Sequence, residues 1–186
     1  MTTAAPQIEI PLSAPEREIY LADLTAGPAS EFHRALRCRL EVPVREETLA
    51  AAFEDVCRRE PRVRCRIRRH DKGFHFEPVD AAACVYAESL HWPAGSPYLH
   101  RRLTAEAQRS IDPVHGPLAR GTLLRYDGIA ELTLVVHRVL MTMSPHRLLR
   151  LLAESGLPGL PATADRPGGR VSRRRSIRRR WPARAV

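Results

Sequence analysis

The chain has no apolar run near the roughly 18 to 20 residues that a membrane-spanning helix needs. Its first residues, Met1 to Ala5, also lack the basic segment and following apolar stretch of a secretory signal peptide. We therefore expect a cytoplasmic protein without a membrane span.

The cysteines and histidines also lack the spacing of metal ligands. The four cysteines form no CxxC pair, and no histidine cluster completes a set: they are Cys38, Cys57, Cys65 and Cys84. Zinc sites are built from closely spaced Cys and His ligands. We expect no metal site, and we expect the cysteines to be small buried hydrophobic residues in a reducing compartment.

Acidic residues are missing from the end of the chain. The sequence has 30 Lys and Arg against 21 Asp and Glu, a net charge of +9. Nine of these arginines and none of the acids fall within residues 166–186, so the preceding part is neutral. Together with prolines and glycines from Pro158 on, this predicts a disordered basic tail over 158–186. We expect the tail to bind polyanions weakly and nonspecifically, through counterion release.

Residues 1–157 are long enough for one domain with a hydrophobic core. Alternating apolar and charged residues predict a strand over 32–42, and apolar residues at helical spacing predict a helix over 46–58. A second alternating stretch with a turn at 71–73 predicts a hairpin over 62–78. Four arginines of this hairpin are expected to form one solvated strand face: Arg62, Arg64, Arg66 and Arg68.

The second half of this domain has clear start and stop signals. Ser96-Pro97 predicts a helix start, and Asp127-Gly128 predicts a hairpin of strands 118–126 and 129–140. Ser144-Pro145 predicts a last helix that ends near Gly156. The order of these elements predicts an α/β fold, a mixed sheet with packed helices.

Four segments carry motifs. Residues 12–21 read LSAPEREIYL, residues 59–67 read REPRVRCRI, and residues 106–120 read EAQRSIDPVHGPLAR. The fourth is an apolar strand that ends in His137-Arg138 and is followed by Ser144. In this order they resemble the LSxxQxxxWxL, RHPxLRTxF, EAxRxFDLxxGPLxR and HHxxxDGxS motifs of condensation domains of nonribosomal peptide synthetases.

The resemblance implies a fold and a chemistry. Condensation domains have two chloramphenicol-acetyltransferase-like lobes with the active site between them, and all four matches belong to the first lobe. The chain therefore resembles a single N-terminal lobe. In the family, amide bonds form between substrates carried on phosphopantetheine carrier proteins, and the domain itself binds no cofactor. The second histidine of the paired motif is the catalytic one.

The histidine motif departs from the family pattern, and two registers stay open. Aligned from the following helix, which we prefer, His137 takes the catalytic position and Val136, Met141 and Thr142 replace the first His, Asp and Gly. Aligned from the preceding strand, His137 is the first histidine, Arg138 takes the catalytic position, and Thr142 and Met143 replace Asp-Gly. In both registers the supporting carboxylate is absent, so nothing in the sequence holds His137 in place as a general base.

His137 is thus the one candidate catalytic residue, with a strand-closing histidine bonded to a backbone group as the alternative. His115 is expected to be a loop residue, and the other histidines are dispersed.

Three hypotheses of function follow. The first is a truncated, weakly active or inactive condensation-type acyltransferase lobe of secondary-metabolite biosynthesis. The second is a non-catalytic module that binds a partner, and the third is a truncated gene remnant. Partners would be a carrier protein, a second condensation lobe or a second copy. We expect an apolar contact surface for such a lobe, formed by Met141, Met143, Leu148 and Leu151.

Overall fold

The computed structural model describes residues 10–26, 32–71 and 73–160. Its helices are α1 (Ala14–Ala26), α2 (Glu46–Arg59), α3 (Pro97–Gln108) and α4 (Pro145–Glu154). Its strands are β1 (Ile10–Pro11), β2 (His33–Arg39), β3 (Cys65–His70), β4 (Gly73–Pro78), β5 (Val85–Ser89), β6 (Ala119–Tyr126) and β7 (Ile129–His137). Two short 3₁₀ turns, η2 (Pro61–Arg64) and η3 (Ala81–Cys84), precede β3 and β5.

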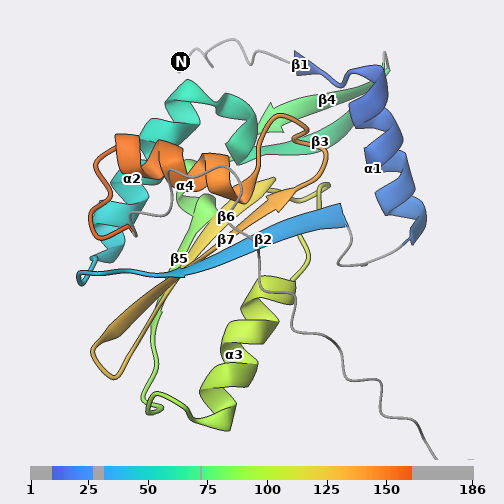
Figure 1. Ribbon diagram of the computed structural model, residues 1–186. Helices are drawn as coiled ribbons and strands as arrows, with labels where there is room; N and C mark the ends of the chain where they lie inside the picture. The colour runs from blue at the N-terminus through green and yellow to red at the C-terminus, as the bar shows by residue number, and fades with distance from the viewer. Residues whose placement is uncertain (1–9, 27–31, 72, 161–186) are drawn as a thin grey trace, which may run out of the picture.

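The larger sheet has four strands in the order β2-β7-β6-β5. Strands β2, β7 and β6 are antiparallel, and β5 runs parallel to β6, so the sheet is mixed as the sequence predicts. A smaller antiparallel sheet has the order β1-β4-β3. Figure 1 shows α2 and α4 together over one face of the larger sheet, α3 on the opposite face, and α1 beside the smaller sheet.

The two faces of the larger sheet differ in chemistry. Leu123, Leu132 and Leu134 are fully buried in the main hydrophobic core with the helices α2 and α4. Gly121 lies in the same layer, where a Cβ atom would stand 2.5 Å from the ring of Phe53 on α2. Only glycine lets the helix pack this closely on β6. Thr122, the next residue, points the other way and meets α3.

Local signals placed most elements correctly. Ser96 accepts a hydrogen bond from Tyr98 N at the start of α3, and Ser144 accepts one from Arg147 N at the start of α4. Asp127 and Gly128 both have positive φ, 46° and 72°, as a two-residue hairpin turn requires. The strand predicted over 129–140 ends earlier, at His137.

The arginine face predicted on the first hairpin is wrong in part. Arg62 and Arg64 lie in η2, before the strand begins, because Pro61 starts a 3₁₀ turn there. Arg62 pairs with Glu16 of α1 at 2.9 Å. Only Arg66 and Arg68 share a strand face, and both bond to Glu77 on β4. Arg62, Arg66 and Arg68 therefore pair with carboxylates of neighbouring elements, although Arg62 and Arg68 stay 44% and 45% exposed.

The expected apolar contact surface also needs correction. Met143 is 4% exposed and Leu148 is fully buried, because the turn after β7 folds them into the main core. Leu151 is half-buried and packs against that core. Met141 alone of the four is largely exposed, at 52%.

The last described residues bear on the predicted boundary between the domain and the tail. The described residues continue past residue 157 to Leu160, and Gly159 accepts a hydrogen bond from Glu41 N at 2.7 Å. The rest of the predicted tail, 161–186, lies outside the described residues, and the division after residue 157 stays a prediction. Within the described ranges, no helix is long and apolar enough to cross a membrane.

Candidate functional site

His137 lies at the last position of β7, in the interior of the protein. Its side chain is 1% exposed, and its backbone N–H donates to the carbonyl of Leu118 at 2.8 Å. Strand β2 places His33 directly opposite it in the sheet register. The end of α1 approaches from the side, with Asp23 Oδ2 3.2 Å from His137 Nε2.

The second ring nitrogen of His137 is also occupied. The backbone N–H of Val139 lies 3.2 Å from Nδ1. A backbone N–H can only donate, so Nδ1 must be the unprotonated acceptor and Nε2 carries the proton. That proton then points to the carboxylate of Asp23. The neutral imidazole has one ring-nitrogen lone pair that can accept a hydrogen bond, and the backbone N–H of Val139 occupies it.

The sequence allowed two interpretations of His137, a catalytic base or a strand-closing histidine bonded to a backbone group, and the structure has features of both. A backbone group does satisfy the ring, as expected for a strand-closing histidine. The expectation that nothing holds His137 in place is wrong, because Asp23 and Val139 fix both nitrogens. The carboxylate comes from α1 and not from the residues after the strand. A base must offer a free lone pair to the proton it removes, and His137 offers none in this conformation.

Burial dominates the electrostatics of the site. It lowers the pKa of His137 below the ordinary histidine value, although the neighbouring charge of Asp23 and its hydrogen bond act in the opposite direction. Burial also lowers the pKa of His33, and the positive charge of Arg120 adds to this effect. Both histidines are therefore held in the neutral form near neutral pH.

The family-like segment 106–120 forms a buried ion-pair network beside this site. Glu106 of α3 is 1% exposed and accepts from Arg102 at 2.9 Å and from Thr122 Oγ1 at 2.8 Å. Arg120 of β6 meets the same carboxylate at 3.4 Å and donates to the carbonyls of Ser110, Glu106 and Arg109. The first and last residues of the motif thus fix α3 to the sheet.

The carboxylate of Glu106 stays ionised in this network. Burial works against its charge, but the hydrogen bonds from Arg102 and Thr122 and the nearby arginines hold its pKa below the usual value. The segment therefore has a structural role, and it positions β6 next to His137.

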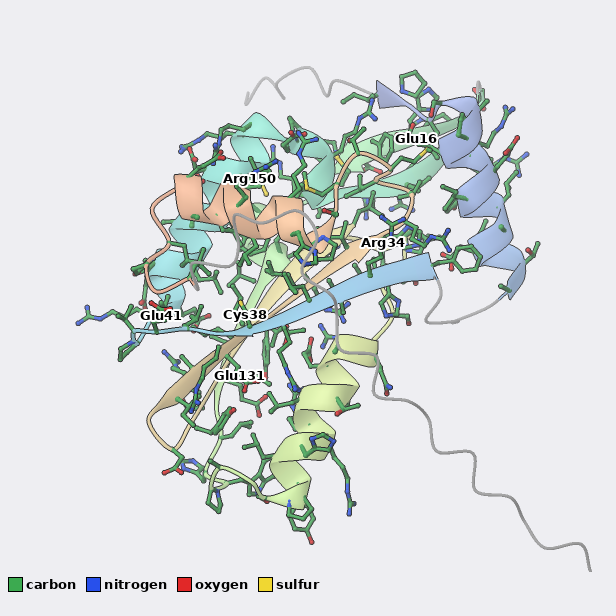
Figure 2. The ribbon with its side chains drawn as sticks, in the orientation of Figure 1. Glu16, Arg34, Cys38, Glu41, Glu131 and Arg150 are labelled. Carbon is green, nitrogen blue, oxygen red and sulfur yellow. The ribbon has the colours of Figure 1, made fainter. Side chains whose placement is uncertain are left out.

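The opening motif has a similar structural role. Glu16, where the family has glutamine, lies at the start of α1 (Figure 2) and accepts from the backbone N–H and the hydroxyl of Ser13 at 2.8 and 2.7 Å. Its other oxygen accepts from Arg62 of η2. Two of the matched motifs therefore meet here, and they hold α1 where Asp23 reaches His137.

The other residues considered from the sequence, His115 and the four cysteines, do not belong to this site. His115 lies in an exposed loop, as expected, with Nδ1 2.6 Å from Asp112. All four cysteines are free thiols, and Cys57, Cys65 and Cys84 are buried while Cys38 is half-buried. No group of three or more metal-ligating side chains occurs among the residues that the structure describes.

Asp23 is the site residue that sequence reasoning missed. A signal for its helix was present, because Ser13 and Glu16 have the spacing of a helix capping box. No local pattern connects Asp23 with a residue 114 positions later in the chain. Only the packing of α1 against the end of β7 brings them together.

Comparison with known proteins defines the class of fold. Neither a protein-family model nor a curated protein sequence matches the chain. The starter condensation domain of rhizomide synthetase RzmA matches with a TM-score of 0.64 and 19% identity, over 79% of this chain and 36% of that one. The epimerization domain from the third module of tyrocidine synthetase B matches with a TM-score of 0.60 and 17% identity, over 83% and 35%.

A third solved structure agrees with these two. The tallysomycin biosynthesis protein TlmII matches with a TM-score of 0.61 and 22% identity, over 79% of this chain and 35% of that one. The chain therefore has the condensation-domain fold and spans little more than one third of the length of these relatives. The expected fold class, an α/β single lobe of the chloramphenicol-acetyltransferase type, is confirmed.

Proposed function

We propose that this chain is a condensation-domain-like lobe of nonribosomal peptide biosynthesis that does not form amide bonds by itself. The fold of its structural neighbours supports the first part. The observation that carries the second part is the double occupation of the His137 ring, by Asp23 at Nε2 and by Val139 at Nδ1. A carrier-bound amine would find no free base on this histidine.

The proposal includes the partners and the location of the lobe. Substrates of the family are expected on phosphopantetheine arms of carrier proteins, so this chain needs no cofactor of its own. Condensation domains have two lobes, so we expect a second lobe to complete the site, and we place the protein in the cytoplasm. The basic tail adds weak polyanion binding.

The catalytic part of the proposal has a direct test. The full chain is incubated with carrier proteins loaded with an acyl donor and an amine acceptor, and the amide product is measured by mass spectrometry. We expect no product above a protein-free blank, because the only lone pair of the imidazole is bonded to the backbone. Product that disappears in His137→Ala but persists in His115→Ala, an exposed loop control, would overturn the proposal.

The exposed side chain of Met141 favours partner binding as the second function. It lies in the turn after β7, four residues after His137, and is 52% exposed. Two leucines of α1, the helix that carries Asp23, are also exposed: Leu21 at 42% and Leu24 at 49%. Large apolar side chains in water next to the candidate site suit a contact with a second lobe or a second copy.

Self-association through Met141 can be measured by light scattering on the purified chain. We expect an apparent mass above the monomer that rises with concentration, and a shift towards monomer in Met141→Asp. Val42→Asp is the matched control, because Val42 is 42% exposed and precedes α2. A monomer at all concentrations, or equal behaviour of the two variants, would remove Met141 from the contact.

A further inference from the structure

A cavity of about 690 Å³ lies between α2 and η3. Residues 47, 50, 51 and 54 of α2 line it, and this spacing places them together on one face of the helix. Residues 80–82, at the start of η3, line it as well. His137 and its partners are not among the lining residues. A space of this size is in the range of small-molecule binding sites.

The helix that forms this wall is held firmly by the core. Leu49, Phe53 and Val56 of α2 are fully buried in the main hydrophobic cluster. Ala50 and Ala51 line the cavity instead, and their short side chains leave the space beside the helix open. The fold itself therefore forms the cavity, and a ligand requires no movement of α2.

Five charged residues of the described chain line the cavity, and two of them already have close partners. Arg58 pairs with Asp55 at 2.9 Å, and Asp80 accepts a hydrogen bond from the backbone N–H of Ala82 at 3.0 Å. The other three have no ion pair and no side-chain hydrogen bond with the residues that the structure describes: Glu47, Glu54 and Arg64.

Arg64 is the least solvated of these three residues. It is half-buried, and its Nε atom is shielded from solvent without a hydrogen-bond partner in the described part of the chain. Its backbone carbonyl accepts from the N–H of Val79 at 2.9 Å, which fixes this part of η2 beside the cavity. A buried donor without a partner has lost its hydration without compensation. A ligand carboxylate would supply acceptors in the geometry that a guanidinium favours.

The unpaired charges of the wall define the complementary ligand. Two carboxylates and one guanidinium leave an excess of one negative charge, so the ligand carries one carboxylate and two cationic groups. Glu47 and Glu54 are seven residues apart on α2, which is about 10 Å along the helix axis. Both are exposed and flexible, so two ammonium groups on one short carbon chain can reach both of them.

We propose that the α2–η3 cavity binds a basic amino acid of the lysine type. The ligand carboxylate pairs with Arg64, and the two ammonium groups pair with Glu54 and Glu47. Because these ion pairs are partly exposed, the expected dissociation constant is about 1 mM. The proposal does not depend on the chemistry of His137, so either can fail without the other.

The test is an NMR titration of the full chain with L-lysine at low salt near pH 7. The backbone amide signals of Ala50, Ala51 and Ala82 should shift and reach saturation. Two analogues each lack one group: cadaverine is lysine without the carboxylate, and 6-aminohexanoic acid is lysine without the α-ammonium group. Both should bind about fivefold more weakly. No saturable shift with lysine, or equal affinity for lysine and cadaverine, would overturn the proposal.

Variants assign each group of the ligand to its partner. Arg64→Gln should bind lysine and cadaverine equally, and Glu54→Gln should reduce the preference for lysine over 6-aminohexanoic acid. Arg101→Gln is the matched control, because Arg101 is an exposed residue of α3 on the opposite face of the sheet (Figure 1). An equal loss of the lysine preference in Arg101→Gln would show a nonspecific charge effect and refute the site. Thermal unfolding identifies any variant that fails to fold, and the analogue series on the unchanged chain then decides.

Discussion

Replacement of Glu106 by alanine should destabilise the protein by about 3 to 5 kcal/mol, the usual cost of breaking a buried ion pair from one side. The carboxylate is 1% exposed and meets Arg102, Arg120 and Thr122. Without it, the buried guanidinium of Arg120 keeps only carbonyl partners. The measurement is the free energy of unfolding from urea titration, with loss of α3 helicity in circular dichroism.

Two controls make the Glu106 result specific. Glu106→Gln keeps the size and one acceptor oxygen, so its cost should be intermediate. Glu154→Ala breaks an exposed pair with Arg59 at 3.2 Å and should cost less than about 1 kcal/mol. Equal effects of Glu106→Ala and Glu154→Ala would mean that the network does not hold α3.

Acidification below about pH 6.5 should destabilise the protein, before most carboxylates titrate. His33 and His137 have pKa values below the ordinary histidine value in the folded state because they are buried. Unfolding restores a pKa near 6.5, so the unfolded chain binds more protons in this range. The free energy of unfolding should fall by up to about 1.4 kcal/mol per pH unit for each such histidine. This contribution is complete above pH 6.5 and is lost as the pH falls.

His137→Gln should remove one histidine from this pH dependence. Three charged or titratable groups act on the His137 ring: Asp23 from α1, His33 from β2 and Arg138 in the following turn. All remain in the variant. The slope of the free energy of unfolding against pH, measured below about pH 6.5, should therefore decrease by up to about 1.4 kcal/mol per pH unit, the contribution of one bound proton. His91→Gln, at an exposed position, is the control and should keep the original slope. An unchanged slope in His137→Gln would show that His137 titrates normally.

Local patterns were sufficient for most of the fold. The turn at Asp127-Gly128 and the caps at Ser96 and Ser144 act through neighbouring backbone atoms, so sequence alone indicates them. The exposure of Met143 and Leu148 could not be derived in this way. Their burial depends on how the chain turns after β7 and packs against the sheet and the helices.

Only one residue of the candidate site, His137, could be predicted from the sequence. His137 stands out because it ends an apolar strand in a recognisable motif. Its partners are a helix residue 114 positions earlier and a backbone N–H two positions later. Both depend on tertiary structure. Sequence reasoning therefore identified which histidine to examine and misjudged what supports it.

Strand β2 forms one edge of the larger sheet, and three of its seven residues are exposed arginines: Arg34, Arg37 and Arg39. Two copies that paired along this edge would bring arginines against arginines, and like charges on adjacent strands repel. The edge is therefore protected against uncontrolled sheet extension and aggregation. A partner with acidic side chains could lie along the same strand without this penalty, so the edge itself would select hetero-association over growth into fibres.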